Sequence, residues 1–301
     1  MSISLTEPLD QARLWTHKLL FIDGDPGRWF ALGFCAFLYE IGNGGGGGGN
    51  FLTNFPPGGG GTGGGAGVEN LSLVVGIAVA VMIVIVGITT LVLWLGSRGT
   101  FVFLDGIVCN RARIGGAWSE FAPQAQSLFY FRLLFTLGAI ALFAGPAFAA
   151  YLFMGDAIEQ LFEGPFLVII LLGAVVVGFA FALVQFIVND FVVPLMYLNR
   201  SRFAPAWREA TALISRHLGS FLLYLIFRVV LAFAAMVLTF LIVLLTCCIA
   251  AIPYIGTVIR LPILVFMKSY NLYFLSQFGG ELERFARLGE EGALDLAEVF
   301  E

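Results

Sequence analysis

The chain has 301 residues, of which 59% are hydrophobic and 12% are charged, and its formal net charge is −4. A soluble domain usually carries about 25% charged residues, so this composition excludes an ordinary water-soluble globule. The weakly negative charge gives no basis for nucleic-acid binding, which requires a strongly basic surface. The sequence therefore predicts an all-α integral membrane protein.

Residues 1–27 form the first predicted segment. Glu7, Asp10, Asp23 and Asp25 occupy the region where a secretory signal peptide needs a basic start followed by an apolar core. We therefore expect a cytoplasmic N-terminal segment, with membrane insertion depending on helices further along the chain.

The next segment, 28–41, is short for a membrane span, which takes about 20 apolar residues. It would cross only if Arg28 and Glu40 reached opposite faces and the bilayer thinned. The alternative is an interfacial or re-entrant helix. The Gly-rich stretch 42–67 follows, and we expect it to be a flexible, non-cytoplasmic loop.

Longer apolar segments make up the rest of a single membrane domain, which we place at 28–280. Each is long enough to cross a bilayer of about 30 Å as a helix. With segment 28–41 they predict a bundle of about six transmembrane helices, followed by a cytoplasmic tail at 281–301. The longer segments are 71–96, 128–154, 165–197, 219–249 and 257–278.

The distribution of charges predicts the topology. Most Lys and Arg residues lie in the N-terminal segment, in the connections after residues 96 and 197, and in the tail. The intervening loops carry acidic residues instead, among them Glu69 and Glu163. Because basic residues are retained on the cytoplasmic side, both termini are expected to be cytoplasmic if six segments cross.

Two of the basic connections resemble each other. Asn110–Trp118 and Asn199–Trp207 share an Asn, two Arg, an Ala and a Trp at matching positions, and an aromatic–Arg pair follows each, Phe131-Arg132 or Phe227-Arg228. Arg attracts anionic headgroups and Trp prefers the membrane interface. They are predicted to be two amphipathic interfacial connectors; the alternative is ordinary positive-inside anchoring with a chance similarity. The candidate lipid-facing residues are Arg111, Arg113, Trp118, Arg200, Arg202 and Trp207.

Several of these segments carry a family resemblance. Asp190–Met196, Ala206–Arg208, Phe221–Leu225 and the opening Arg28–Phe34 before a Gly-rich loop are similar to uncharacterised bacterial multi-pass families. These families are often labelled as membrane domains of glycerophosphodiester phosphodiesterases. The resemblance implies a six-helix protein of the bacterial inner membrane. It implies no activity here, because the soluble catalytic domain is absent.

Polar residues interrupt the segment 165–197 near its end. Gln185 and Asn189 lie one helical turn apart, with Asp190 adjacent. The ring of Pro194 would clash with the Asp190 carbonyl and remove its hydrogen bond. We therefore predict a helix kink with a free carbonyl at Asp190.

Charged residues inside a membrane span are functional candidates because they are costly to insert. Counting from the cytoplasmic ends places Asp190, Arg228 and Lys268 at similar depth, so Asp190 is expected to pair with Arg228 or Lys268 in the bundle interior. The cluster could act as a proton or substrate relay. A static ion pair is the favoured alternative, since one carboxylate with two bases makes a poor proton wire.

Small residues suggest where helices approach one another. Gly173, Ala174, Gly178 and Ala182 are expected to mark packing faces.

No motif for a nucleophile, a dinucleotide or a metal is present, and the four cysteines form no CxxC pair. We therefore expect no catalytic residue, no metal and no cofactor. The predicted role is a non-enzymatic scaffold or accessory subunit that contacts membrane lipids and either a protein partner or a second copy. The alternative is a small transporter or channel with its polar site at the kinked fourth helix.

Overall fold

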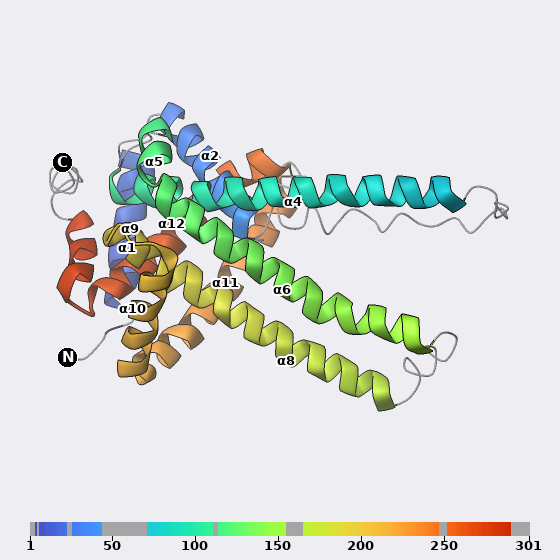
Figure 1. The fold of residues 1–301 in the computed structure, drawn as a ribbon. Helices are drawn as coiled ribbons and strands as arrows, with labels where there is room; N and C mark the ends of the chain where they lie inside the picture. Colours follow the sequence, from blue (N-terminus) through green and yellow to red (C-terminus); the bar gives the residue numbers. More distant parts are fainter. Residues whose placement is uncertain are drawn as a thin grey trace.

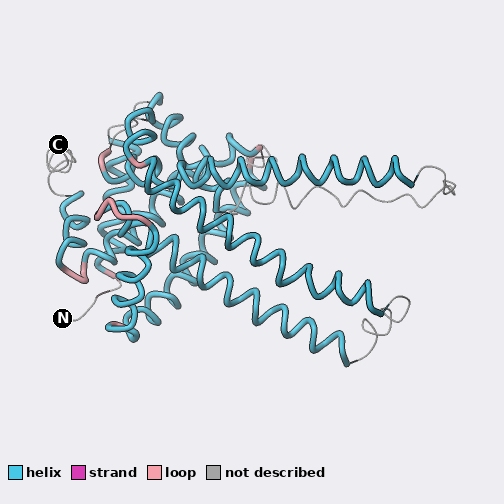
Figure 2. The backbone as a smooth tube through the Cα atoms, in the orientation of Figure 1, coloured by secondary structure: helices cyan, strands magenta, loops and turns pink. Residues whose placement is uncertain are grey.

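The structure, a computed structural model, describes residues 4, 6–22, 26–43, 71–110, 114–154, 165–246 and 252–289. These residues are almost entirely helical and contain no strand (Figure 2). The predicted all-α class is confirmed. The elements in chain order are α1 (Glu7–His17), η1 (Lys18–Ile22), α2 (Pro26–Asn43), α4 (Leu71–Val108), α5 (Ile114–Glu120), α6 (Ala122–Met154), α8 (Pro165–Ile187), η4 (Val188–Val192), α9 (Val193–Leu198), α10 (Phe203–Arg216), α11 (Leu218–Leu245), α12 (Pro253–Ser276) and η6 (Gly280–Gly289).

Five of the described helices are long and apolar enough to cross a membrane. They match the five longer predicted segments. Helix α2, which covers the short segment 28–41, is not among them, and whether it crosses stays a prediction. The candidate spans are Val79–Val108, Ala122–Leu142, Ile170–Leu198, Leu218–Leu245 and Tyr254–Ser276.

The spans gather at one end of the molecule and separate towards the other. Figure 1 shows α4, α6 and α8 running out of a compact end that contains α1, α5, α9 and α10. In the most apolar windows of the first four candidate spans, between 0% and 22% of the residues are buried within the chain, against 72% in α12. The core therefore lies at the compact end, and α12 is the most enclosed of the candidate spans.

Helix α4 is longer than the predicted segment 71–96. It continues to Val108, so Arg98 lies within a helix, and its expected place in a loop is wrong. Beyond Gly96 the helix is buried on nearly all sides, with Phe101, Phe103 and Leu104 at most 3% exposed. Burial within the compact end therefore continues the helix past the point where the strongest hydropathy ends.

The close approach of helices occurs between α2 and α4. A methyl group added at Gly96 would lie 2.0 Å from the Gly42 Cα, and one at Gly99 would lie 2.4 Å from the Leu38 Cβ. We expected the small residues around Gly173 and Gly178 to mark a face of α8 that packs closely against another helix. Among the described residues this prediction is wrong, because a methyl group added at either glycine meets nothing within 4 Å. Their neighbours Ala174 and Ala182 are exposed.

The N-terminal segment contains a helix that the sequence analysis did not predict. Helix α1 and the π-helical turn η1 bury Ala12, Trp15 and Leu19, and α1 packs against α12. The Ser4 N–H donates to Gln277 Oε1 at 2.7 Å, and Gln277 Nε2 donates to the Ser4 carbonyl at 2.8 Å. The start of the described chain therefore contacts the end of α12 at the compact end.

Some predicted features lie outside the described residues. These are Arg111 and Arg113 of the first connector, residues 44–67 of the Gly-rich stretch, and residues 290–301 of the tail.

Candidate functional site

The site is organised by an irregular turn at the end of α8. The turn η4 is π-helical, and the Val193 N–H donates to the Val188 carbonyl five residues earlier. Such single π-turns inside helices are often found at functional sites. In this register the N–H of residue 194 would bond to the carbonyl of Asn189, but Pro194 has no N–H to donate.

Lys268 takes the place of the missing donor. Its Nζ donates to the Asn189 carbonyl at 3.0 Å. The Asn189 carbonyl, which this register leaves without a backbone donor, is thus bonded by a side chain, and a free carbonyl at Asp190 stays a prediction.

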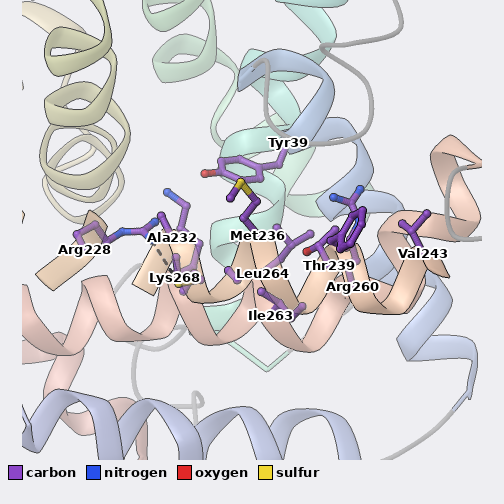
Figure 3. A pocket seen from close by; sticks show the side chains of 13 residues that line it. Tyr39, Arg228, Ala232, Met236, Thr239, Val243, Arg260, Ile263, Leu264 and Lys268 are labelled. Atoms are coloured by element: carbon purple, nitrogen blue, oxygen red, sulfur yellow. Dashed lines mark hydrogen bonds between the residues drawn. The ribbon is translucent and has the colours of Figure 1, made fainter. Parts of the chain in front are cut away.

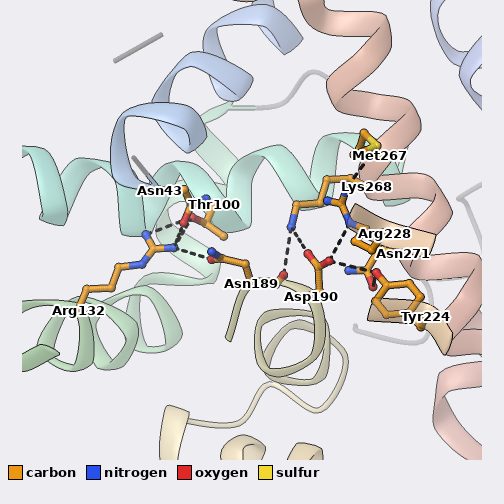
Figure 4. Close-up of polar contacts among 10 residues, drawn as sticks. All are labelled: Asn43, Thr100, Arg132, Asn189, Asp190, Tyr224, Arg228, Met267, Lys268 and Asn271. Atoms are coloured by element: carbon orange, nitrogen blue, oxygen red, sulfur yellow. Dashed lines mark hydrogen bonds and ion pairs between the residues drawn. The ribbon is translucent and has the colours of Figure 1, made fainter. Parts of the chain in front are cut away.

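Asp190 is buried beside two cations (Figure 4). Its Oδ2 accepts from Arg228 Nε at 3.0 Å and from the Tyr224 hydroxyl at 3.0 Å. Lys268 Nζ lies 3.8 Å from Oδ1. Asp190 is 3% exposed and Lys268 is 5% exposed, so water screens this group little. The structure thus brings both expected cations to one carboxylate, leaving one surplus positive charge.

The remaining polar atoms of these cations face weak acceptors. Lys268 Nζ lies 4.9 Å from the centre of the Tyr39 ring. Arg228 Nη1 lies 3.3 Å from the Met267 sulfur, which accepts hydrogen bonds poorly. Among the described residues, no oxygen accepts a hydrogen bond from either terminal nitrogen of Arg228. Its guanidinium is therefore only partly satisfied.

A second arginine reaches the same turn from α6. Arg132 is 1% exposed, and its Nη2 donates to Asn189 Oδ1 at 3.2 Å. It also donates to Asn43 Oδ1 and, at 3.4 Å, to the Thr100 hydroxyl. No carboxylate pairs with Arg132 in the part of the chain that the structure describes. Sequence reasoning missed this residue, although its pairing with Phe131 matches that of Arg228 with Phe227.

The two repeated arginines thus meet adjacent residues of one turn, Arg132 at Asn189 and Arg228 at Asp190. We call these four residues and Lys268 the π-turn cluster. Gln185, the other predicted member, is half-buried one turn earlier, and within the described structure it has no hydrogen bond to the cluster. The cluster joins α6, η4, α11 and α12 through their side chains. The cluster is buried and carries a net positive charge, and among the described residues it has Asp190 as its single carboxylate, with no second acid to exchange protons with.

A separate buried ion pair connects α2 to α12. Arg260 Nη2 donates to Glu40 Oε2 at 3.0 Å, and the Thr257 hydroxyl donates to the same oxygen at 2.8 Å. Glu40 and Arg260 are 4% and 6% exposed. The two charges of this pair balance each other, unlike those around Asp190.

Two of the predicted lipid-facing residues, Trp118 and Trp207, are half-buried against other aromatic side chains. Trp118 packs edge-on against Trp94, and Arg98 lies between them, 4.8 Å from the centre of the Trp94 ring. Trp207 stacks on Phe203.

Among the predicted connector arginines, Arg200 forms an ion pair with Glu120, and Arg202 is exposed at the start of α10. The buried Ala206 and Ala210 turn one face of α10 towards the protein. Lipid contact by these residues stays a prediction.

Comparison with known proteins gives one match. The sequence model of a family of unknown function, DUF7544, matches residues 3–259. No curated protein and no solved structure matches the chain. The match provides no link to the membrane domains of glycerophosphodiester phosphodiesterases, and that resemblance stays a prediction.

Proposed function

The chain belongs to the DUF7544 family of unknown function, and we propose that it is a non-enzymatic membrane scaffold or accessory subunit. In this role it presents separated transmembrane helices to lipids and to helices of a partner protein. The observation that carries the proposal is the exposure of four apolar candidate spans, whose windows are 0–22% buried within the chain.

The divergence of α4, α6 and α8 supports this role (Figure 1). In lipid there is no hydrophobic drive between apolar helices, so helices associate through close packing and interhelical hydrogen bonds. The exposed lengths of these three helices make few such contacts with their own chain. They therefore leave surfaces free for helices of another protein, or of a second copy.

The π-turn cluster supplies the rigidity that such a role requires. Its members come from four helices and hold them at the compact end, from which the exposed lengths extend. Asp190 is 3% exposed and enclosed by Arg228, Lys268 and Tyr224. This enclosure favours a static ion pair over the relay that a transporter would need, so we favour the scaffold.

We also propose a location in a bacterial inner membrane with both termini cytoplasmic. The meeting of Ser4 and Gln277 at the compact end supports placing the two termini on one side. The amphipathic α1 and η6, which flank the candidate spans, suit the cytoplasmic face of the membrane.

Photo-crosslinking in native membranes tests the scaffold role. A photoreactive amino acid would replace Ile83 of α4 or Leu172 of α8, which are 67% and 63% exposed, with Ile107, 0% exposed, as the matched buried control. We expect both exposed positions to give the same protein adduct of defined size, identified by mass spectrometry, and the control to give none. Lipid adducts alone from both exposed positions would contradict the proposal.

A further inference from the structure

An elongated groove lies between α11 and α12, beside the π-turn cluster (Figure 3). Its volume is about 580 Å³, within the range of pockets that enclose small-molecule ligands. Apolar side chains, among them Met236, Phe240 and Leu264, line its length. From Ala232 to Val243 the groove follows α11 for about 16 Å, since a helix rises 1.5 Å per residue.

The two ends of the groove differ in charge. Arg260 lies at one end and is balanced by Glu40. Arg228 and Lys268 lie at the other end and share Asp190 as their carboxylate among the described residues. The end with Arg228 and Lys268 therefore carries one net positive charge.

Hydrogen bonding at the positive end is also incomplete. Arg228 Nη1 has a sulfur as its acceptor, and no oxygen of the described chain accepts from the terminal nitrogens. A guanidinium that faces hydrocarbon with unsatisfied N–H groups is costly. An anionic oxygen group would accept hydrogen bonds from these donors and neutralise the surplus charge. The planar guanidinium of Arg228 is suited to this, because it can donate two parallel hydrogen bonds to two oxygens of one phosphate.

We propose that this groove binds one bilayer phospholipid of net charge −1, with its phosphate at Arg228 and Lys268 and one acyl chain along α11 and α12. Apolar walls and one end with a net positive charge match the division of such a lipid into chain and headgroup. A zwitterionic lipid brings its own cation to this end and leaves the surplus charge in place. The inference requires that α11 and α12 face lipid; it does not require that the protein is a scaffold.

The protein contains a natural control on the same pair of helices. A second groove of about 310 Å³ is lined by Leu231, Ala234, Leu238, Pro262 and other apolar residues, with no charged side chain. Ala232 lines the charged groove and Ala234 lines the apolar one, and both are exposed. A phenyl ring at either position adds the same volume to α11 but fills a different groove.

Native mass spectrometry of the full chain tests the proposal. The protein would be extracted from vesicles of phosphatidylcholine with a minor fraction of phosphatidylglycerol, and the retained lipid identified. We expect wild type and Ala234→Phe to retain one phosphatidylglycerol. Ala232→Phe should retain it about tenfold more weakly, as the loss of one or two buried methylene contacts predicts.

Three results would overturn the assignment. They are equal retention of phosphatidylcholine, equal effects of the two Phe variants, and displacement of phosphatidylglycerol by oleate at equal concentration, which would identify a free fatty acid instead. A measurement on wild type alone guards against unstable variants. Phosphatidylglycerol micelles should raise the thermal unfolding midpoint more than phosphatidylcholine micelles do, and an equal effect of both would also refute the proposal.

Discussion

Replacing Asp190 by Asn removes the negative charge of the π-turn cluster with little change in shape. Arg228 and Lys268 then face each other's charge without a carboxylate among the described residues. Removing one partner of a buried ion pair costs about 3–5 kcal/mol, because the other charge stays buried and uncompensated. Asp190 and Lys268 are 3% and 5% exposed, so solvent offers little relief, and we expect a loss within this range.

Because Asp190 has two cations, loss of the carboxylate and loss of Lys268 should lower the free energy of unfolding by different amounts, which a simple ion pair would not predict. Replacing Lys268 by Met removes the surplus cation and leaves Asp190 paired with Arg228 at 3.0 Å. This variant loses the bond to the Asn189 carbonyl, a net cost of about 1–2 kcal/mol. Lys268→Met should therefore be clearly milder than Asp190→Asn, and the double variant should be more stable than Asp190→Asn alone.

The assay is equilibrium unfolding in mixed detergent micelles, followed by circular dichroism. Glu120→Gln is the control, because it breaks the exposed pair with Arg200, whose side chain is 35% exposed against 43% for Glu120. Exposed pairs contribute about 0–1 kcal/mol. Equal free energies of unfolding for Asp190→Asn and Glu120→Gln would refute the reasoning, as would a Lys268→Met variant less stable than Asp190→Asn.

Two further predictions concern contacts of α2. Gly96→Ala should lower the free energy of unfolding by about 1–3 kcal/mol, because the added methyl group overpacks against Gly42. Gly87→Ala in the same helix is the control and should not destabilise, because a methyl group there meets nothing within 4 Å. Equal thermal midpoints for the two variants would contradict the close approach of α2 and α4. Glu40→Gln should cost about 3–5 kcal/mol, because it removes the charged partner of Arg260 in a buried ion pair. Proteolysis that detaches α2 no faster than in wild type would count against it.

The long helices could be predicted from the sequence because lipid imposes a simple requirement. A span must be apolar for about 20 residues, and the five candidate spans satisfy it. The depth of Asp190, Arg228 and Lys268 followed from the constant rise of a helix. Such counting works because each residue lies a similar number of turns from the end of its span.

Features that depend on packing between distant segments could not be predicted in this way. The acceptors of Arg132 are neutral side chains on three other elements, and no charge pattern points to Asn43 or Thr100. The π-turn depends on a one-residue insertion that hydropathy does not register. Helix α1 was missed because it is too polar to span a membrane, and its buried stripe through Ala12 and Trp15 exists only where α12 covers it.

The enclosed position of α12 has a consequence for the order of assembly during synthesis. This helix follows the other four candidate spans in the chain, yet it supplies Lys268 to Asp190 and Arg260 to Glu40. Until it is inserted, Glu40 lacks its cation and α1 lacks the surface on which it packs. During synthesis these contacts of α12 can therefore form only after the other four candidate spans have been made, whereas α2 and α4 can pack together earlier.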